Sequence, residues 1–188
     1  DRAEEIKAEN ADKIICYAMG RHVPYKGIEY LVRASKLLDD KFSVYIGGQG
    51  PLTESLKELA QGDDKVHFLG RVSDEEATAY MLACDIFCFP SITKNEAFGI
   101  ALAEAMYFSN PAVTFTIDGS GVYYVSLDGV TGIEAENGNV EKYAQALQTL
   151  AKDESLRQKY GEAAKQRVLD NFTFEKFKEN VNSLLETI

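Results

Sequence analysis

Residues 90–108 read PSITKNEAFGIALAEAMYF, and the rest of the chain is organised around this stretch. It joins the end of a short apolar run, DIFCFPS, to a segment of small and apolar residues from Gly99 to Phe108, which is predicted as a helix. A helix that is apolar on every side is typically covered on every side. Glu104 is the exception to this pattern. Because an unpaired carboxylate in a dry interior costs several kcal/mol, Glu104 either points to water or meets partners from outside the helix.

Glu96 lies eight residues before Glu104, just ahead of the predicted helix. The backbone N–H groups from Phe98 to Ala101 fall at the helix start, where they lack partners within the helix and form an anion site. Two carboxylates that face hydroxyl donors, beside a helix N-terminus suited to phosphate, match the groups of a sugar nucleotide. The same residues also fit a simpler interpretation, in which both glutamates lie on the open side of a surface helix.

The pair Glu96 and Glu104, with Ala97-Phe98-Gly99 after the first glutamate, resembles the donor-site signature of retaining glycosyltransferases with the GT-B architecture. More closely, it resembles the group 1 family, which includes many capsule and lipopolysaccharide sugar transferases. The remaining sequence shows whether other motifs of that family are present in order.

The length and composition are those of one globular domain with a real core. The chain has 188 residues, of which 45% are hydrophobic and 27% charged. Its formal charge of −10 argues against a general nucleic-acid or anionic-membrane surface, because such surfaces are basic. No window resembles a signal peptide or a transmembrane segment. The chain begins at Asp1 without a Met, which is typical of a fragment or a processed product.

Three cysteines, Cys16, Cys84 and Cys88, lie in or beside apolar runs. An odd number of cysteines in such positions predicts buried thiols in a reducing compartment. A metal site at Cys84 and Cys88 is disfavoured, because both histidines are remote in sequence and the chain has no second cluster of ligands.

Short apolar runs alternate with helical patterns along the chain. The predicted strands are 13–20, 42–48, 66–70, 85–91, 112–117 and 132–136, and the predicted helices are 28–40, 52–60, 73–84, 96–108, 140–152, 155–171 and 173–188. Residues 1–12 fit a linker or a lead-in helix. Continuously apolar strands that alternate with helices indicate parallel βαβ units covered on both faces. The expected fold is a Rossmann-like three-layer α/β/α sandwich, with a mainly parallel sheet of about six strands and extra C-terminal helices.

Ligands of such sheets bind beyond the carboxyl ends of the strands. The first strand-to-helix loop, residues 20–27, carries Arg21 and Lys26 in an otherwise acidic chain. Arginine offers phosphate a fork of donors and lysine a point charge. The resemblance implies that these two side chains hold the donor diphosphate, as in the G-R-x-x-x-x-K-G loop of the group 1 family. Apart from this resemblance, the pattern is also explained by two solvated cations on a loop.

The next two loops are less specific. Residues 47–52, GGQGPL, match the family's G-x-G-P-L turn and complete no dinucleotide fingerprint, which disfavours an NAD-dependent Rossmann domain. Residues 69–73 resemble the family's base-binding edge, which implies that main-chain groups at Val72 read the nucleobase. His67, in the strand before this loop, fits a packed or surface histidine better than a catalyst.

The loop after the fifth strand departs from the family pattern. Family members usually show Pro-Glu where this chain has Tyr123-Tyr124, whereas the D-G-V-T-G turn at residues 128–132 is kept. This departure leaves the main predicted ligands intact and the identity of the sugar open.

The ordered set of motifs over residues 13–175 implies that residues 1–188 form a single donor-binding domain, the C-terminal half of a two-domain GT-B enzyme. The chain is then part of a retaining hexosyltransferase of polysaccharide biosynthesis, inactive without the N-terminal acceptor domain. The implied catalytic residues are Arg21, Lys26 and Glu96, and the implied substrate-binding residues are Val72, Ala97, Phe98, Gly99, Ile100, Ala101 and Glu104.

The expected partners are a nucleoside-diphosphate sugar, with UDP or GDP favoured, and a glycan or lipid-linked acceptor bound through the missing domain; no nucleic acid is expected. No cofactor or metal is expected, because no Asp-x-Asp signature is present and the loop cations can neutralise the leaving group. The expected location is the cytoplasm, with peripheral attachment at the inner membrane face as a variant for the full-length protein. The alternative function is a non-catalytic nucleotide or nucleotide-sugar binding module.

Overall fold

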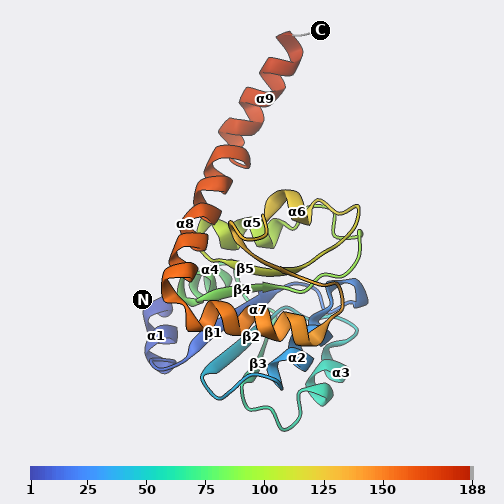
Figure 1. Ribbon diagram of the computed structural model, residues 1–188, viewed down its shortest axis with the longest axis vertical. Coiled ribbons are helices and arrows are strands. Elements are labelled where there is room, and N and C mark those ends of the chain that lie inside the picture. The colour runs from blue at the N-terminus through green and yellow to red at the C-terminus, as the bar shows by residue number, and fades with distance from the viewer. Residues whose placement is uncertain (187–188) are drawn as a thin grey trace.

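The computed structural model describes residues 1–186, which form one six-stranded parallel sheet between layers of helices (Figure 1). The spatial order of the strands is β3-β2-β1-β4-β5-β6. Their bounds are β1 (Ile14–Met19), β2 (Phe42–Gly47), β3 (Val66–Gly70), β4 (Ile86–Phe89), β5 (Ala112–Phe115) and β6 (Gly132–Ala135). The predicted Rossmann-like α/β fold and all six predicted strands are confirmed.

The helices of the described chain connect and flank these strands. Their bounds are α1 (Arg2–Glu9), the 3₁₀ helix η1 (Pro24–Lys26), α2 (Ile28–Ser35), α3 (Thr53–Leu59), α4 (Asp74–Ala83), α5 (Ile100–Tyr107), α6 (Val122–Val125), α7 (Val140–Lys152), α8 (Glu154–Asn171) and α9 (Phe174–Glu186). The predicted last helix, 173–188, ends outside the described residues.

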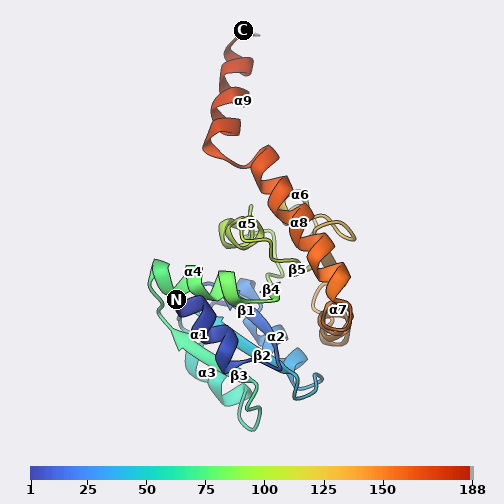
Figure 2. The same cartoon turned by 90° about the vertical axis from the view of Figure 1, so that its left-hand side faces the viewer.

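Two groups of helices cover the two faces of the sheet. Helix α2 packs against α3 and α7, whereas α1 packs on α4 and α8 packs on α5 (Figure 2). Right-handed crossovers place α2 and α3 on one face and α4 and α5 on the other, because the chain leaves β1 in one direction along the sheet and β4 in the other. Helix α9 extends beyond both layers (Figures 1 and 2).

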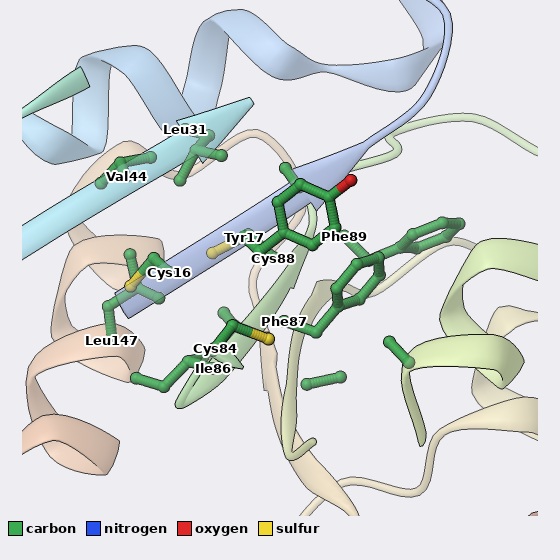
Figure 3. Close-up of a cluster of buried hydrophobic side chains, with 14 of the residues drawn as sticks. Cys16, Tyr17, Leu31, Val44, Cys84, Ile86, Phe87, Cys88, Phe89 and Leu147 are labelled. Atoms are coloured by element: carbon green, nitrogen blue, oxygen red, sulfur yellow. The ribbon is translucent and has the colours of Figure 1, made fainter. Parts of the chain in front are cut away.

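The core lies where the central strands meet these helices. Figure 3 shows side chains of β1 and β4 clustered in the core with Leu31 of α2 and Leu147 of α7. The rings of Tyr17 and Phe87 meet edge to face, with centroids 6.0 Å apart. The three cysteines are free and buried in the described chain, as predicted. Continuous burial of β1 and β4 explains why these runs carry no polar alternation.

Local predictions failed mainly at element ends. Helix α2 ends at Ser35 rather than residue 40, and the short helices η1 and α6 were not predicted. Residues 1–12 contain a lead-in helix, α1, rather than a linker. At the start of α4, Ser73 accepts the Glu76 N–H at 3.2 Å and so caps the helix, and the Glu76 carboxylate accepts a hydrogen bond from Arg2.

The apolar sequence of α5 favoured cover on every side except at Glu104; Ile100 shows that this is wrong, while Glu104 points to water, one of the two arrangements expected for it. Leu102, Ala105 and Met106 are its buried residues, whereas Ile100 is 70% exposed and Glu104 faces solvent. A row of small and apolar residues does not itself dictate burial, because alanine is tolerated on both sides of a helix. In the described chain, no helix combines the length and the apolar character needed to cross a membrane.

Candidate functional site

The site forms at the point where the direction of the sheet connections reverses. Strands β1 and β4 are neighbours, and the chain leaves them toward opposite edges of the sheet. Their following loops, residues 20–27 and 90–99, therefore lie side by side at the carboxyl ends of the strands. Crevices of this kind are where ligands bind in open parallel sheets.

Lys26 and Glu96 meet across this crevice. The Lys26 Nζ lies 2.5 Å from a carboxylate oxygen of Glu96, and their side chains are only 15% and 10% exposed. The same oxygen accepts a hydrogen bond from the Ser91 hydroxyl at 2.8 Å. An ammonium group has three donors, so this contact leaves Lys26 able to donate to a second anion.

The backbone of the first loop is tied down near Lys26. Gly27 has a left-handed conformation with φ of 60°, and a Cβ there would collide with the carbonyl oxygen of Pro90. Only glycine satisfies both conditions. The resulting close approach brings the two loops together, which accounts for the Lys26–Glu96 contact.

Arg21 lies at the other end of the same loop and is exposed. Its guanidinium Nη2 donates to the Tyr25 hydroxyl at 3.2 Å. The structure therefore places Arg21 and Lys26 on one loop, with Arg21 free to turn most of its donors to solvent or to a ligand.

The start of α5 is a second element of the crevice. Gly99 precedes the helix with φ of 91°, and a Cβ at this position would lie 3.0 Å from the Phe89 ring. Lys26 Nζ lies 5.2 Å from the centroid of the same ring. Within residues 1–186, the N–H groups from Phe98 to Ala101 donate to no described acceptor. An ammonium and a helix N-terminus thus flank one aromatic ring, an arrangement that suits an anion.

The other predicted residues of this segment have different surroundings. The Ala97 carbonyl accepts the Gly121 N–H at 3.0 Å, and the Phe98 ring meets Phe172 edge to face with centroids 5.3 Å apart. Ala101 is half-buried. These contacts indicate that Ala97 and Phe98 shape the loop, while the N–H groups of Phe98 and Ile100 remain available to a ligand.

Glu104 lies in the second turn of α5, eight residues after Glu96. Its carboxylate makes no hydrogen bond or ion pair with any described residue. Partial burial and the negative charge of Asp74, at the start of α4, raise its pKa. The structure therefore assigns the two glutamates to different surroundings, Glu96 to the crevice and Glu104 to the exposed face that looks toward α4.

Val72, the predicted base-binding position, lies in the loop after β3 and is half-buried. Strand β3 is the edge strand on the β1 side of the crevice. The preceding Gly70 carbonyl accepts the Gly48 N–H at 2.7 Å, which ties this loop to the turn after β2. The predicted site residues thus follow the carboxyl edge of the sheet from β3 to β4.

Three polar residues of the site were missed in the sequence: Ser91, Ser120 and His22. The Ser120 hydroxyl donates to the Glu96 carbonyl, so Glu96 is held at its backbone as well as its carboxylate. His22 is fully buried, and burial lowers its pKa. They lie in the loops that follow strands β4, β5 and β1, and this placement was the available signal. In the described chain, no cluster of three or more His, Cys, Asp or Glu side chains is arranged to hold a metal ion.

Comparisons with known proteins agree with this architecture. The family model "Glycosyl transferases group 1" matches residues 1–167. The D-rhamnosyltransferase WbpZ of Pseudomonas aeruginosa is 34% identical over 151 residues, which are 79% of this chain and 39% of that protein. The O-antigen chain mannosyltransferase C of Escherichia coli is 31% identical, over 79% of this chain and 40% of its own length. The chain therefore spans about two fifths of the length of these curated relatives.

Solved structures show the same fold at low identity. Anabaena Alr3699/HepE, crystallised with UDP and glucose, superposes with a TM-score of 0.86 at 20% identity, over 100% of this chain and 52% of that one. The C-terminal domain of the group 1 protein LpcC from Francisella tularensis gives 0.78 at 20% identity, over 93% and 94% of the two chains. Together with the match over residues 1–167, these likenesses show that the chain belongs to the group 1 glycosyl transferases and has the fold of their GT-B C-terminal domains.

Proposed function

We propose that this chain binds the nucleoside-diphosphate sugar of a retaining hexosyltransferase that acts in polysaccharide biosynthesis. The observation that carries the proposal is the Lys26–Glu96 pair, which lies beside the free N-terminus of α5 at the switch point of the sheet. The crevice joins a cationic and a carboxylate group within one small site, and a sugar nucleotide carries an anion beside hydroxyl groups.

The diphosphate takes the place between the loop of residues 20–27 and the start of α5. Arg21 and Lys26 contribute charge, and the unpaired N–H groups from Phe98 to Ala101 contribute a helix N-terminus. Negative charge develops on the diphosphate as the bond to the sugar breaks. Donors that are already in place stabilise that charge without reorganisation, which is the main electrostatic means of catalysis.

The two carboxylates have separate roles in this proposal. Glu96, whose other oxygen remains open to a ligand, accepts hydrogen bonds from hydroxyls of the transferred sugar. Glu104 accepts hydrogen bonds from the ribose, which lies between α5 and the start of α4. Main-chain groups at Val72 contact the base. Binding a ribose at Glu104 gives the exposed carboxylate the partners that it lacks among the described residues.

The acceptor, a glycan or a lipid-linked sugar, binds to the N-terminal half of the full-length protein and completes the active site. The names of the rhamnosyl- and mannosyltransferase relatives support a hexose or deoxyhexose donor. The buried thiols are compatible with the cytoplasm, where we place the protein.

Thermal unfolding of the 188-residue chain in the presence of UDP, GDP, ADP or NAD tests the proposal. A nucleoside diphosphate present at 100 times its dissociation constant is expected to stabilise the fold by about 2.7 kcal/mol. Binding of NAD alone, or of none of these compounds, contradicts it. For the full-length protein, the anomeric configuration of the product, measured by NMR, decides whether transfer is retaining.

A further inference from the structure

His22 follows Arg21 directly and is the most completely buried polar residue of the loop, with 0% of its surface exposed. Its Nδ1 lies 2.9 Å from the Thr53 hydroxyl at the start of α3. The same hydroxyl accepts the Gly50 N–H at 2.9 Å. The ring of His22 thus contacts the turn between β2 and α3, outside the loop that carries it.

The backbone of His22 is bound to the same turn. Its N–H donates to the Gln49 carbonyl at 3.2 Å, and its own carbonyl accepts the Leu52 N–H at 3.1 Å. Three separate contacts therefore hold this one residue against the turn of residues 47–53. Arg21, by contrast, has one side-chain hydrogen bond, to Tyr25 within its own loop.

The Nε2 of His22 is also buried and has no hydrogen-bond partner in the part of the chain that the structure describes. An unsatisfied buried polar atom lowers stability, typically by about 1–3 kcal/mol. An apolar side chain of similar size avoids this cost, so packing alone does not account for a histidine here. The contact that an apolar side chain cannot make is the one to Thr53.

We infer that His22 is a positioning residue for the donor diphosphate. It anchors the first end of the cationic loop to the turn after β2, and Gly27 anchors the other end against Pro90. The two anchors hold Arg21 and Lys26 in place before a ligand arrives, which lowers the entropy lost on binding. This inference rests on the proposed function, because it assumes that the loop binds a diphosphate.

Two substitutions remove the anchor in different ways. His22→Leu removes the ring nitrogens, and Thr53→Val removes the hydroxyl that Nδ1 contacts, together with the acceptor of the Gly50 N–H, with little change of shape. Each is expected to weaken UDP or GDP about five- to tenfold, the equivalent of one buried hydrogen bond, while binding of the plain nucleoside is unchanged. His22→Asn places a polar atom close to the position of Nδ1 and should restore affinity to within about twofold of the unchanged chain.

A double-mutant cycle with Arg21→Ala separates positioning from general stability. If His22 acts through Arg21, adding His22→Leu to Arg21→Ala causes little further loss of diphosphate affinity. Additive losses, or equal losses for nucleoside and diphosphate, overturn the inference. Normal diphosphate binding by both His22→Leu and Thr53→Val also overturns it and leaves the proposed function intact. Failure of the unchanged chain to bind UDP or GDP overturns both.

Discussion

The Lys26–Glu96 pair gives a quantitative prediction for the stability of the unliganded chain. Breaking a buried ion pair by removing one partner costs about 3–5 kcal/mol, because the other charge is left uncompensated. The two side chains remain 15% and 10% exposed, so water can still solvate the charge that is left and offsets part of this cost. We therefore expect Glu96→Gln and Lys26→Met each to lower the free energy of unfolding by about 2–3 kcal/mol.

For a chain of this length, 1 kcal/mol corresponds to roughly 2–4 °C in the melting temperature, so the expected decrease is about 4–12 °C. Lys57→Met provides the matched control. Lys57 pairs with Glu54 at 3.0 Å, but their side chains are 50% and 81% exposed. An exposed pair of this kind contributes about 0–1 kcal/mol, so its loss should change the melting temperature little.

Adding a nucleoside diphosphate should change the result for one variant of the pair. In Glu96→Gln the ammonium of Lys26 is still present, and the diphosphate supplies the anion that it lacks. The deficit in melting temperature of this variant should therefore narrow at saturating UDP or GDP, whereas that of Lys26→Met should not. Differential scanning calorimetry with and without ligand measures both effects.

Two results would refute this reasoning. One is a coupling energy between Lys26→Met and Glu96→Gln below about 0.5 kcal/mol in a double-mutant cycle, since contacting charges should not be additive. The other is a deficit in Glu96→Gln that the diphosphate leaves unchanged, which would mean that Lys26 does not contact the phosphates.

Four further predictions concern other groups. The pKa of Glu104 is raised, so the stability that this carboxyl contributes is lost as the pH rises from 4.5 through the raised value. Glu104→Gln should therefore slightly raise the melting temperature at pH 7, and it should weaken the binding of UDP or GDP about tenfold. A lower melting temperature with unchanged affinity would contradict this. Burial raises the pKa of Asp63, but hydrogen bonds from Lys65 and Ser35 outweigh it, and the net pKa lies below the usual 3.8. Asp63→Asn should therefore lower the free energy of unfolding at neutral pH. Urea titrations should show that this loss of stability becomes smaller as the pH falls below 3.8, and a loss that does not depend on pH would contradict the prediction. Diphosphate affinity should survive EDTA; loss of binding that only magnesium or manganese restores would show that a metal is needed. Finally, Arg21→Ala should weaken diphosphate binding far more than nucleoside binding, and equal losses for the two ligands would contradict a role at the phosphates.

The sequence alone was sufficient for the elements and their class. The apolar run of β4 and the helical spacing of α7 are local patterns, because each is formed by residues close together in the sequence. Alternation of the two predicted a parallel sheet, and the loops at its carboxyl edge then indicated where polar residues should gather. Arg21, Lys26 and Glu96 were found in this way, although their roles remain predictions.

The tertiary structure decided which of these residues meet. Lys26 and Glu96 are 70 positions apart, and they touch because strand order places β1 beside β4 and because Gly27 packs against Pro90. No local pattern contains that information. The burial of α5 was likewise decided by the tertiary structure, because the side of a helix that is covered depends on what packs against it. The apolar sequence of α5 favoured burial, but its packing partners cover one face and leave Glu104 in solvent.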